Sequence, residues 1–164
     1  MKGKVLVAGI GNIFLGDDAF GVEVAQQLAQ RPLPSIVEVR DYGIRSYDLA
    51  YALMEDWELV ILVDAVPAGD APGTVYVIEP ESPGGAESSA AFDAHTMNPV
   101  SVLQLVTALG GTPARMQVVG CEPERIDSDE DGQIGLSEPV RRAVDEAVRV
   151  IEDLVARQVR AKAA

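Results

Sequence analysis

Cysteine, basic residues and long apolar runs are what this sequence has least of. Its 164 residues include one cysteine, which excludes an intrachain disulfide and fits a reducing compartment. Lys and Arg number 13 against 26 Asp and Glu, and a formal net charge of −13 disfavours nucleic acid and anionic membranes as partners. No apolar stretch is long enough to span a membrane. The N-terminal apolar run is interrupted by Gly9, Gly11 and Asn12, whereas a secretory signal peptide has a continuous apolar segment. These absences predict a cytoplasmic protein without nucleic-acid or membrane partners.

The sequence does contain enough apolar material for one hydrophobic core. Hydrophobic residues make up 48% of the chain, and this length is typical of one domain. Apolar patterns of strand and helix type alternate along the chain, which predicts an α/β fold. We expect a single-domain three-layer sandwich over residues 1–160, with a mostly parallel, twisted sheet covered by helices on both faces, and a C-terminal tail over residues 161–164.

The expected elements follow from apolar periodicity and from breakers. Strands are expected at residues 5–8, 36–40, 59–63, 74–78 and 116–121. Helices are expected to start near Phe20, Ser46, Asn98 and Glu138, the last running toward Arg160. Residues 79–91 are rich in Pro, Gly, Ser and Glu, which indicates an exposed loop.

The first loop carries the most informative pattern. A strand, a glycine loop and a helix often open a nucleotide-binding domain, but the spacing from Gly11 to Gly16 does not fit the dinucleotide fingerprint. Asp17 and Asp18 stand where a phosphate-binding loop has Lys and Ser or Thr, so the loop repels phosphate and suits a cation. The alternative is helix capping, because Asp is a favoured N-cap residue. One of the pair can cap while the other points elsewhere.

Three acidic residues and the cysteine lie at predicted strand ends. Asp18 follows the first strand, and Asp41, Asp64 and Cys121 end the second, third and last. Because parallel strands end at one edge of a sheet, where open α/β folds bind ligands, we expect these four residues along one edge. A carboxylate such as Asp64 at the end of a buried strand is unfavourable unless it is paired or ligates a metal. If the first and third strands are neighbours, Asp18 and Asp64 repel each other unless a cation or proton separates them.

His95, the only histidine, precedes a predicted helix near the same edge. Taken alone, a single histidine is more often structural or simply exposed. Together with Asp18 and Asp64 it forms a mixed oxygen and nitrogen ligand set, which suits divalent ions such as nickel or zinc. Asp93 can orient the imidazole ring. Cys121 would need His95 beside it to act as a nucleophile, and we expect it to be a small buried residue instead.

A second acidic pattern lies near the C-terminus. Asp127, Asp129, Asp131 and Glu138 fit the spacing of a calcium-binding loop. However, Pro123 lies just upstream, so no helix is expected before the loop, and Glu138 also starts the last helix. Two interpretations remain, a structural calcium site separate from the sheet edge and a solvated acidic loop.

Taken together, the motifs resemble those of the hydrogenase maturation proteases. These endopeptidases trim the C-terminal extension from the large subunit of nickel–iron hydrogenases. The resemblance covers nearly the whole chain. The matching blocks are Gly9–Asn12 with Asp17, Asp18 and Gly21, then Asp41–Gly43, Val63–Ala65, His95, Gly120–Glu124 and Gly135–Ser137.

The resemblance implies that Asp18, Asp64 and His95 form the catalytic, metal-contacting site of a metal-dependent or aspartate-assisted endopeptidase. Members of the family resemble this chain in having an acidic residue, Asp or Glu, at the position of Asp18. The resemblance also implies that the partner is a hydrogenase large-subunit precursor and that the nickel is supplied by this substrate. Either the metal activates water or polarises the scissile carbonyl, or a carboxylate acts as the base. The rival from another class is a non-catalytic nickel-sensing or chaperone module with the same site.

Overall fold

The computed structural model describes residues 3–80, 99–126 and 134–164. Its elements, in chain order, are β1 (Val5–Ile10), the 3-10 turn η1 (Asp17–Ala19), α1 (Phe20–Leu28), β2 (Val37–Gly43), α2 (Ser46–Leu53), β3 (Leu59–Ala65), β4 (Val75–Ile78), α3 (Pro99–Ala108), β5 (Met116–Cys121) and α4 (Glu138–Ala163). The expected alternation of strands and helices is confirmed, with element bounds shifted by a few residues.

The strands form one five-stranded sheet in the order β2-β1-β3-β5-β4. The first four in this order are parallel, and β4 pairs with β5 in the antiparallel direction at the edge. All seven residues of β3 are buried, as expected for a strand covered on both faces. Because β1 and β3 are neighbours, their carboxyl ends lie side by side.

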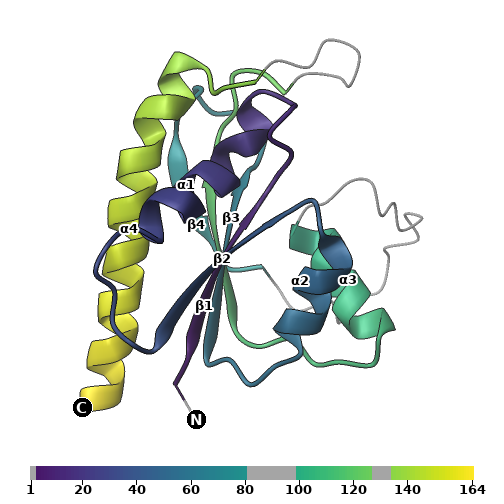
Figure 1. Ribbon diagram of the computed structural model, residues 1–164, viewed down its shortest axis with the longest axis vertical. Coiled ribbons are helices and arrows are strands. Elements are labelled where there is room, and N and C mark those ends of the chain that lie inside the picture. The colour runs from purple at the N-terminus through teal and green to yellow at the C-terminus, as the bar shows by residue number, and fades with distance from the viewer. Residues whose placement is uncertain (1–2, 81–98, 127–133) are drawn as a thin grey trace.

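Helices cover both faces of the sheet, which confirms the three-layer architecture. In Figure 1, α1 and α4 lie on one side of the sheet and α2 and α3 on the other. Alternate side chains of β1 supply the two cores, because successive side chains of a strand point to opposite faces. Val5 and Val7 pack in the core beneath α1 and α4, whereas Leu6 and Ala8 pack in the core beneath α2 and α3.

The last helix is a long amphipathic element with one apolar stripe. The inward-facing residues expected from its periodicity are all buried, namely Val140, Val144, Ala147, Val148, Ile151 and Val155. The helix continues to Ala163, beyond the expected end near Arg160, and no Gly or Pro follows Arg160 to stop it. Within the described ranges, no helix is both long enough and apolar enough to cross a membrane.

Two glycines allow α1 to pack closely against the sheet. A Cβ atom on Gly21 would lie 2.0 Å from the Val63 carbonyl oxygen and 2.4 Å from that of Ile10. A Cβ atom on Gly9 would lie 2.3 Å from the Gly21 carbonyl oxygen. These distances leave no room for a side chain. The start of α1, and with it the turn that carries Asp18, is therefore held against the ends of β1 and β3.

Candidate functional site

Asp18 and Asp64 lie together at the carboxyl edge of the sheet. Asp64 is the penultimate residue of β3 and is 3% exposed, whereas Asp18 follows β1 in η1 and is half-buried. The two carboxyl groups are close enough for the charge of Asp18 to raise the pKa of Asp64. This confirms the expectation that the ends of the first and third strands bring these two acids together.

The Asp18 side chain is fixed by the loop that precedes it. The backbone N–H of Asn12 donates a 2.8 Å hydrogen bond to Asp18 Oδ2. The loop folds back on itself here, because Gly11 has a φ of 140° and a Cβ atom on it would lie 1.8 Å from the Asp18 carbonyl oxygen. Burial raises the pKa of Asp18, and the bond from Asn12 opposes this only in part.

The Asp64 carboxyl group is the most perturbed acid at this edge. Its pKa lies well above the usual range, first because of burial and second because of the charge of Asp18, while the N–H of Ala65 acts in the opposite direction. Two adjacent carboxyl groups with raised pKa values favour a shared proton or a bound cation. Such groups in a cleft also mark candidate functional sites. The donor set and its charge therefore fit a divalent metal ion.

Neither Asp17 nor Asp18 caps a helix, so the capping interpretation is wrong. Gly16 and Ala19 occupy the cap positions of η1 and α1, and no side chain bonds to either helix start. The Asp17 side chain is instead 1% exposed and bonds to the segment after β5 and to the start of α4. Its carboxylate accepts hydrogen bonds from the backbone N–H groups of Glu124 and Arg125, both at 2.9 Å, and from the N–H and hydroxyl of Ser137, at 2.7 and 2.8 Å.

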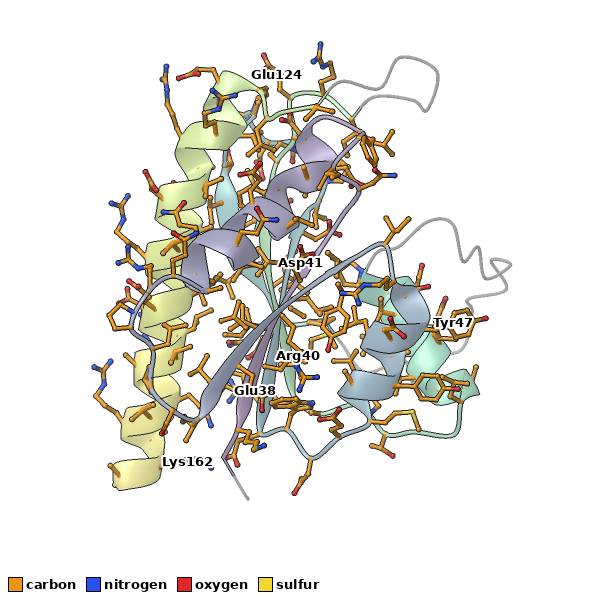
Figure 2. All side chains as sticks on the ribbon, in the orientation of Figure 1. Glu38, Arg40, Asp41, Tyr47, Glu124 and Lys162 are labelled. Atoms are coloured by element: carbon orange, nitrogen blue, oxygen red, sulfur yellow. The ribbon has the colours of Figure 1, made fainter. Side chains whose placement is uncertain are left out.

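The remaining predicted edge residues also lie at strand ends. Figure 2 shows Glu38, Arg40 and Asp41 in succession along β2, so the carboxyl edge faces the top of the view. Asp41 is exposed, and its Oδ1 atom accepts a 2.9 Å hydrogen bond from the N–H of Gly43. Cys121 ends β5 and is fully buried. Burial, followed by nearby acidic charges, raises the pKa of its thiol to about 12, so the group is protonated and unreactive at neutral pH.

Two residues for which the sequence predicted no role hold the loop that follows Asp64. Glu122 is 7% exposed, and its Oε2 atom accepts a 2.7 Å hydrogen bond from the N–H of Ala68. The Tyr76 hydroxyl donates to the carbonyl of Val66, and the Tyr76 ring packs over Gly120. Burial, followed by the charge of Glu122, raises the pKa of Tyr76 to about 12. No sequence pattern indicated these roles, because both contacts join separate loops and strands.

A groove lies beside the loop that holds Asp18. It has a volume of about 350 Å³ and lies between the loop after β1 and the loop after β2. Asn12, which donates to Asp18, forms part of its lining. The exposed apolar side chains of Ile13, Phe14 and Ile44 also line it. Its size and apolar walls are typical of a small ligand-binding cleft.

Several predicted site residues lie outside the described residues. These are His95 with Asp93, in 81–98, and Asp127, Asp129 and Asp131, in 127–133. Glu138 is described, and its exposed carboxylate pairs with Arg142 at 3.1 Å. Within the described part of the chain, no three His, Cys, Asp or Glu residues are grouped to hold a metal. The ligand roles of Asp18, Asp64 and His95, and the calcium loop, therefore stay predictions.

Comparison with known proteins adds independent information. A family model described as hydrogenase maturation protease matches residues 22–154. The hydrogenase 2 maturation protease of Escherichia coli is 30% identical over 153 residues, which cover 90% of this chain and 88% of the relative. Among solved structures, the hydrogenase maturating endopeptidase HybD of E. coli superposes with a TM-score of 0.73 at 29% identity, over 94% of this chain and 93% of that one. A hydrogenase 2 maturation peptidase from a Thaumarchaeota archaeon gives a TM-score of 0.70 at 31% identity, over 93% and 98%.

Proposed function

The chain belongs to the hydrogenase maturation protease family, a family of peptidases, and from this membership we propose that it removes the C-terminal extension of a nickel-loaded hydrogenase large-subunit precursor. The observation that carries the proposal is the pair formed by Asp18 and Asp64. Both carboxyl groups have raised pKa values and lie at the edge of the sheet where α/β folds bind ligands.

The proposed site recognises nickel that is already bound to the substrate. Asp18 and Asp64 offer carboxylate oxygens, and His95 is proposed as the imidazole donor that completes the set. Mixed oxygen and nitrogen donors suit Ni²⁺. A divalent cation between the two carboxylates also removes their mutual repulsion, so this pair favours a metal-loaded precursor over an empty one.

The chain's own residues supply the remaining functions. A carboxyl group with a raised pKa exchanges a proton with water nearer to neutral pH than an ordinary aspartate does, so this pair is suited to act as a base in hydrolysis. The N–H of Asn12 holds Asp18 in place for that role. The groove beside Asn12 is proposed to receive the residues next to the scissile bond, with Phe14 and Ile44 contacting their apolar parts.

The test is cleavage of the precursor with and without nickel. The purified protein is incubated with nickel-loaded and nickel-free precursor, and the mass of the large subunit is followed by mass spectrometry. We expect trimming of the loaded precursor only. His95→Ala and Asp64→Asn should abolish trimming, whereas Asp18→Glu should retain it, because this change keeps the carboxylate. Asp153→Asn, which removes an exposed carboxylate from the second half of α4, is the matched control and should cleave normally.

Each outcome distinguishes a different part of the proposal. Equal trimming of nickel-free precursor would overturn nickel recognition while leaving the peptidase assignment intact. Normal trimming by Asp64→Asn would overturn the assigned site. Tight binding of the loaded precursor without any cleavage would instead favour a nickel-sensing or chaperone module.

A further inference from the structure

Asp17 is a buried carboxylate that the proposed reaction does not use. It is 1% exposed, and it joins three segments of the chain. The first is its own loop, the second is the segment after β5 that contains Glu124 and Arg125, and the third is the start of α4 at Ser137. Figure 2 shows Glu124 at the end of the molecule where α4 begins.

The Ser137 hydroxyl bonds to Asp17 rather than to the first turn of its own helix. It occupies the N-cap position of α4, where a serine hydroxyl ordinarily accepts a hydrogen bond from the first turn. No such bond is present, and the hydroxyl donates to Asp17 Oδ2 at 2.8 Å instead. The backbone N–H of Ser137 donates to Oδ1 at 2.7 Å. The positive end of the α4 dipole therefore also favours the charge on Asp17.

The backbone around Asp17 is tied to the same segment. Its N–H donates to the carbonyl of Arg125 at 3.0 Å, and the preceding residue, Gly16, forms an isolated β-bridge with Ile126. Asp18 comes next, and its Oδ2 atom is held by Asn12 on the opposite side of the loop. Asp17 and Asp18 are thus joined by one peptide bond, so the hydrogen bonds of Asp17 fix the backbone next to the carboxyl group of the proposed site.

We propose that Asp17 is a positioning residue, whose carboxylate holds the first loop against residues 124–125 and Ser137 so that Asp18 keeps its place beside Asp64. This inference rests on the proposed role of Asp18. Asp17 itself contacts no substrate atom. Its effect on cleavage passes through the position of its neighbour, because a small misplacement of a reacting group lowers the rate steeply.

Asp17→Asn tests this with little change in size. Three of the four groups bonded to the Asp17 carboxylate are backbone N–H groups, which can only donate, and each oxygen accepts from at least one of them. The amide NH₂ of an asparagine would therefore face an N–H group in either orientation, even if the Ser137 hydroxyl rotated to accept from it. Ser137→Ala is a milder variant that removes the hydroxyl bond and keeps the backbone bond. Val148→Ala is the control for stability alone, because it opens a cavity in the core under α4, away from the loop.

The first measurement is the NMR signal of the Asn12 amide, which reports the hydrogen bond to Asp18 and needs neither nickel nor precursor. We expect Asp17→Asn to shift this signal upfield and to raise the hydrogen-exchange rate of this amide, with a smaller change in Ser137→Ala. Val148→Ala should lower the melting temperature and leave the signal in place. An unmoved Asn12 signal in Asp17→Asn would overturn the proposal. Should Asp17→Asn fail to fold, an unmoved signal in Ser137→Ala would overturn it equally.

The second measurement is the cleavage rate of the nickel-loaded precursor. We expect Asp17→Asn to lower kcat by about 10- to 100-fold with KM within about twofold, because the docking surface is retained while a reacting group is misplaced. A change in KM alone would contradict a positioning role. If the wild-type protein does not cleave the precursor, the proposed function fails, but the Asn12 signal still decides whether Asp17 positions Asp18.

Discussion

Asp64 ionises in a buried setting, and its raised pKa makes stability depend on pH. An unfolded aspartate has a pKa of about 3.9, whereas burial and the charge of Asp18 raise the pKa of Asp64 in the fold. The folded protein therefore binds this proton more tightly than the unfolded chain. Stability is lost as the pH rises from about 4 to the raised value, by about 1.4 kcal/mol for each unit of difference between the two pKa values.

Asp64→Asn removes this dependence, because an amide does not ionise. We expect the variant to melt at a higher temperature than the wild type at pH 7 and at nearly the same temperature at pH 4. Each kcal/mol corresponds to about 2–4 °C for a domain of this size. Calorimetry at pH 4, 5.5 and 7 measures the difference, with Asp153→Asn, which replaces an exposed carboxylate, as the control. A difference that is constant with pH would contradict the prediction.

Replacing Cys121 with serine tests whether the cysteine takes part in the reaction. A thiol with a pKa of about 12 carries almost no thiolate at neutral pH. We expect Cys121→Ser to cleave at close to the wild-type rate and to be less stable by about 1–3 kcal/mol, because it buries a hydroxyl in an apolar core. Precursor cleavage and thermal melting are the measurements. Lost cleavage in a folded variant would contradict the prediction, as would rapid alkylation of the native wild-type thiol.

At the scale of residues, the sequence predicted which acids meet but not what each one does. Asp18 and Asp64 could be placed at one edge because the ends of neighbouring parallel strands coincide. Asp17 could not be told apart from Asp18, because the two are identical neighbours and the partners of Asp17 lie 107 to 120 positions away. Local patterns carry no information on such distant hydrogen bonds.

The contact between α1 and the sheet decides the effect of a change at Gly21. Helix propensity alone predicts that Gly21→Ala stabilises α1 by about 1 kcal/mol. The new Cβ atom, however, would lie 2.0 Å from the Val63 carbonyl oxygen, so backbone must move. We expect a net loss of about 1–3 kcal/mol and slower cleavage, since Val63 directly precedes Asp64.

Thermal melting and precursor cleavage measure both effects of Gly21→Ala. Gln26→Ala, an exposed change on the same helix, serves as the control and should alter stability by no more than about 0.5 kcal/mol. A rise in melting temperature for Gly21→Ala would show that propensity outweighs the close approach.

At the scale of elements, periodicity predicted each strand and helix, but not all of their relations. Alternation of strands and helices implied a mostly parallel sheet, and β1, β2, β3 and β5 confirm it. The antiparallel direction of β4 was not predicted, because it depends on pairing with β5, more than 30 positions later. The helix expected to start near Ser46 begins with that residue, and Arg45 holds the cap position while its guanidinium donates to the carbonyls of Asp41 and Tyr42.

For the whole molecule, the acidic segment before α4 predicts a response to calcium. If Asp127, Asp129, Asp131 and Glu138 bind the ion, calcium stabilises the fold, because a ligand favours the state that binds it. At 100 times the dissociation constant the gain is about 2.7 kcal/mol, or roughly 5–10 °C in melting temperature. Thermal melting with calcium, with magnesium at the same concentration, and with an Asp129→Asn variant measures this. If titration with calcium gives neither heat nor a thermal shift, the solvated acidic loop is the interpretation that remains.

The bonds between Asp17 and Ser137 also set an order of events during synthesis. A growing chain presents the first loop early, whereas its partners Glu124, Arg125 and Ser137 are made 107 to 120 positions later. A fragment that ends before Glu124 carries both Asp18 and Asp64 but lacks the donors that fix Asp17. Closure of the first loop is therefore a late step in biosynthesis. A stop between Glu124 and Ser137 removes the two donors that Ser137 offers to Asp17, together with α4, although it deletes no residue proposed to touch the substrate.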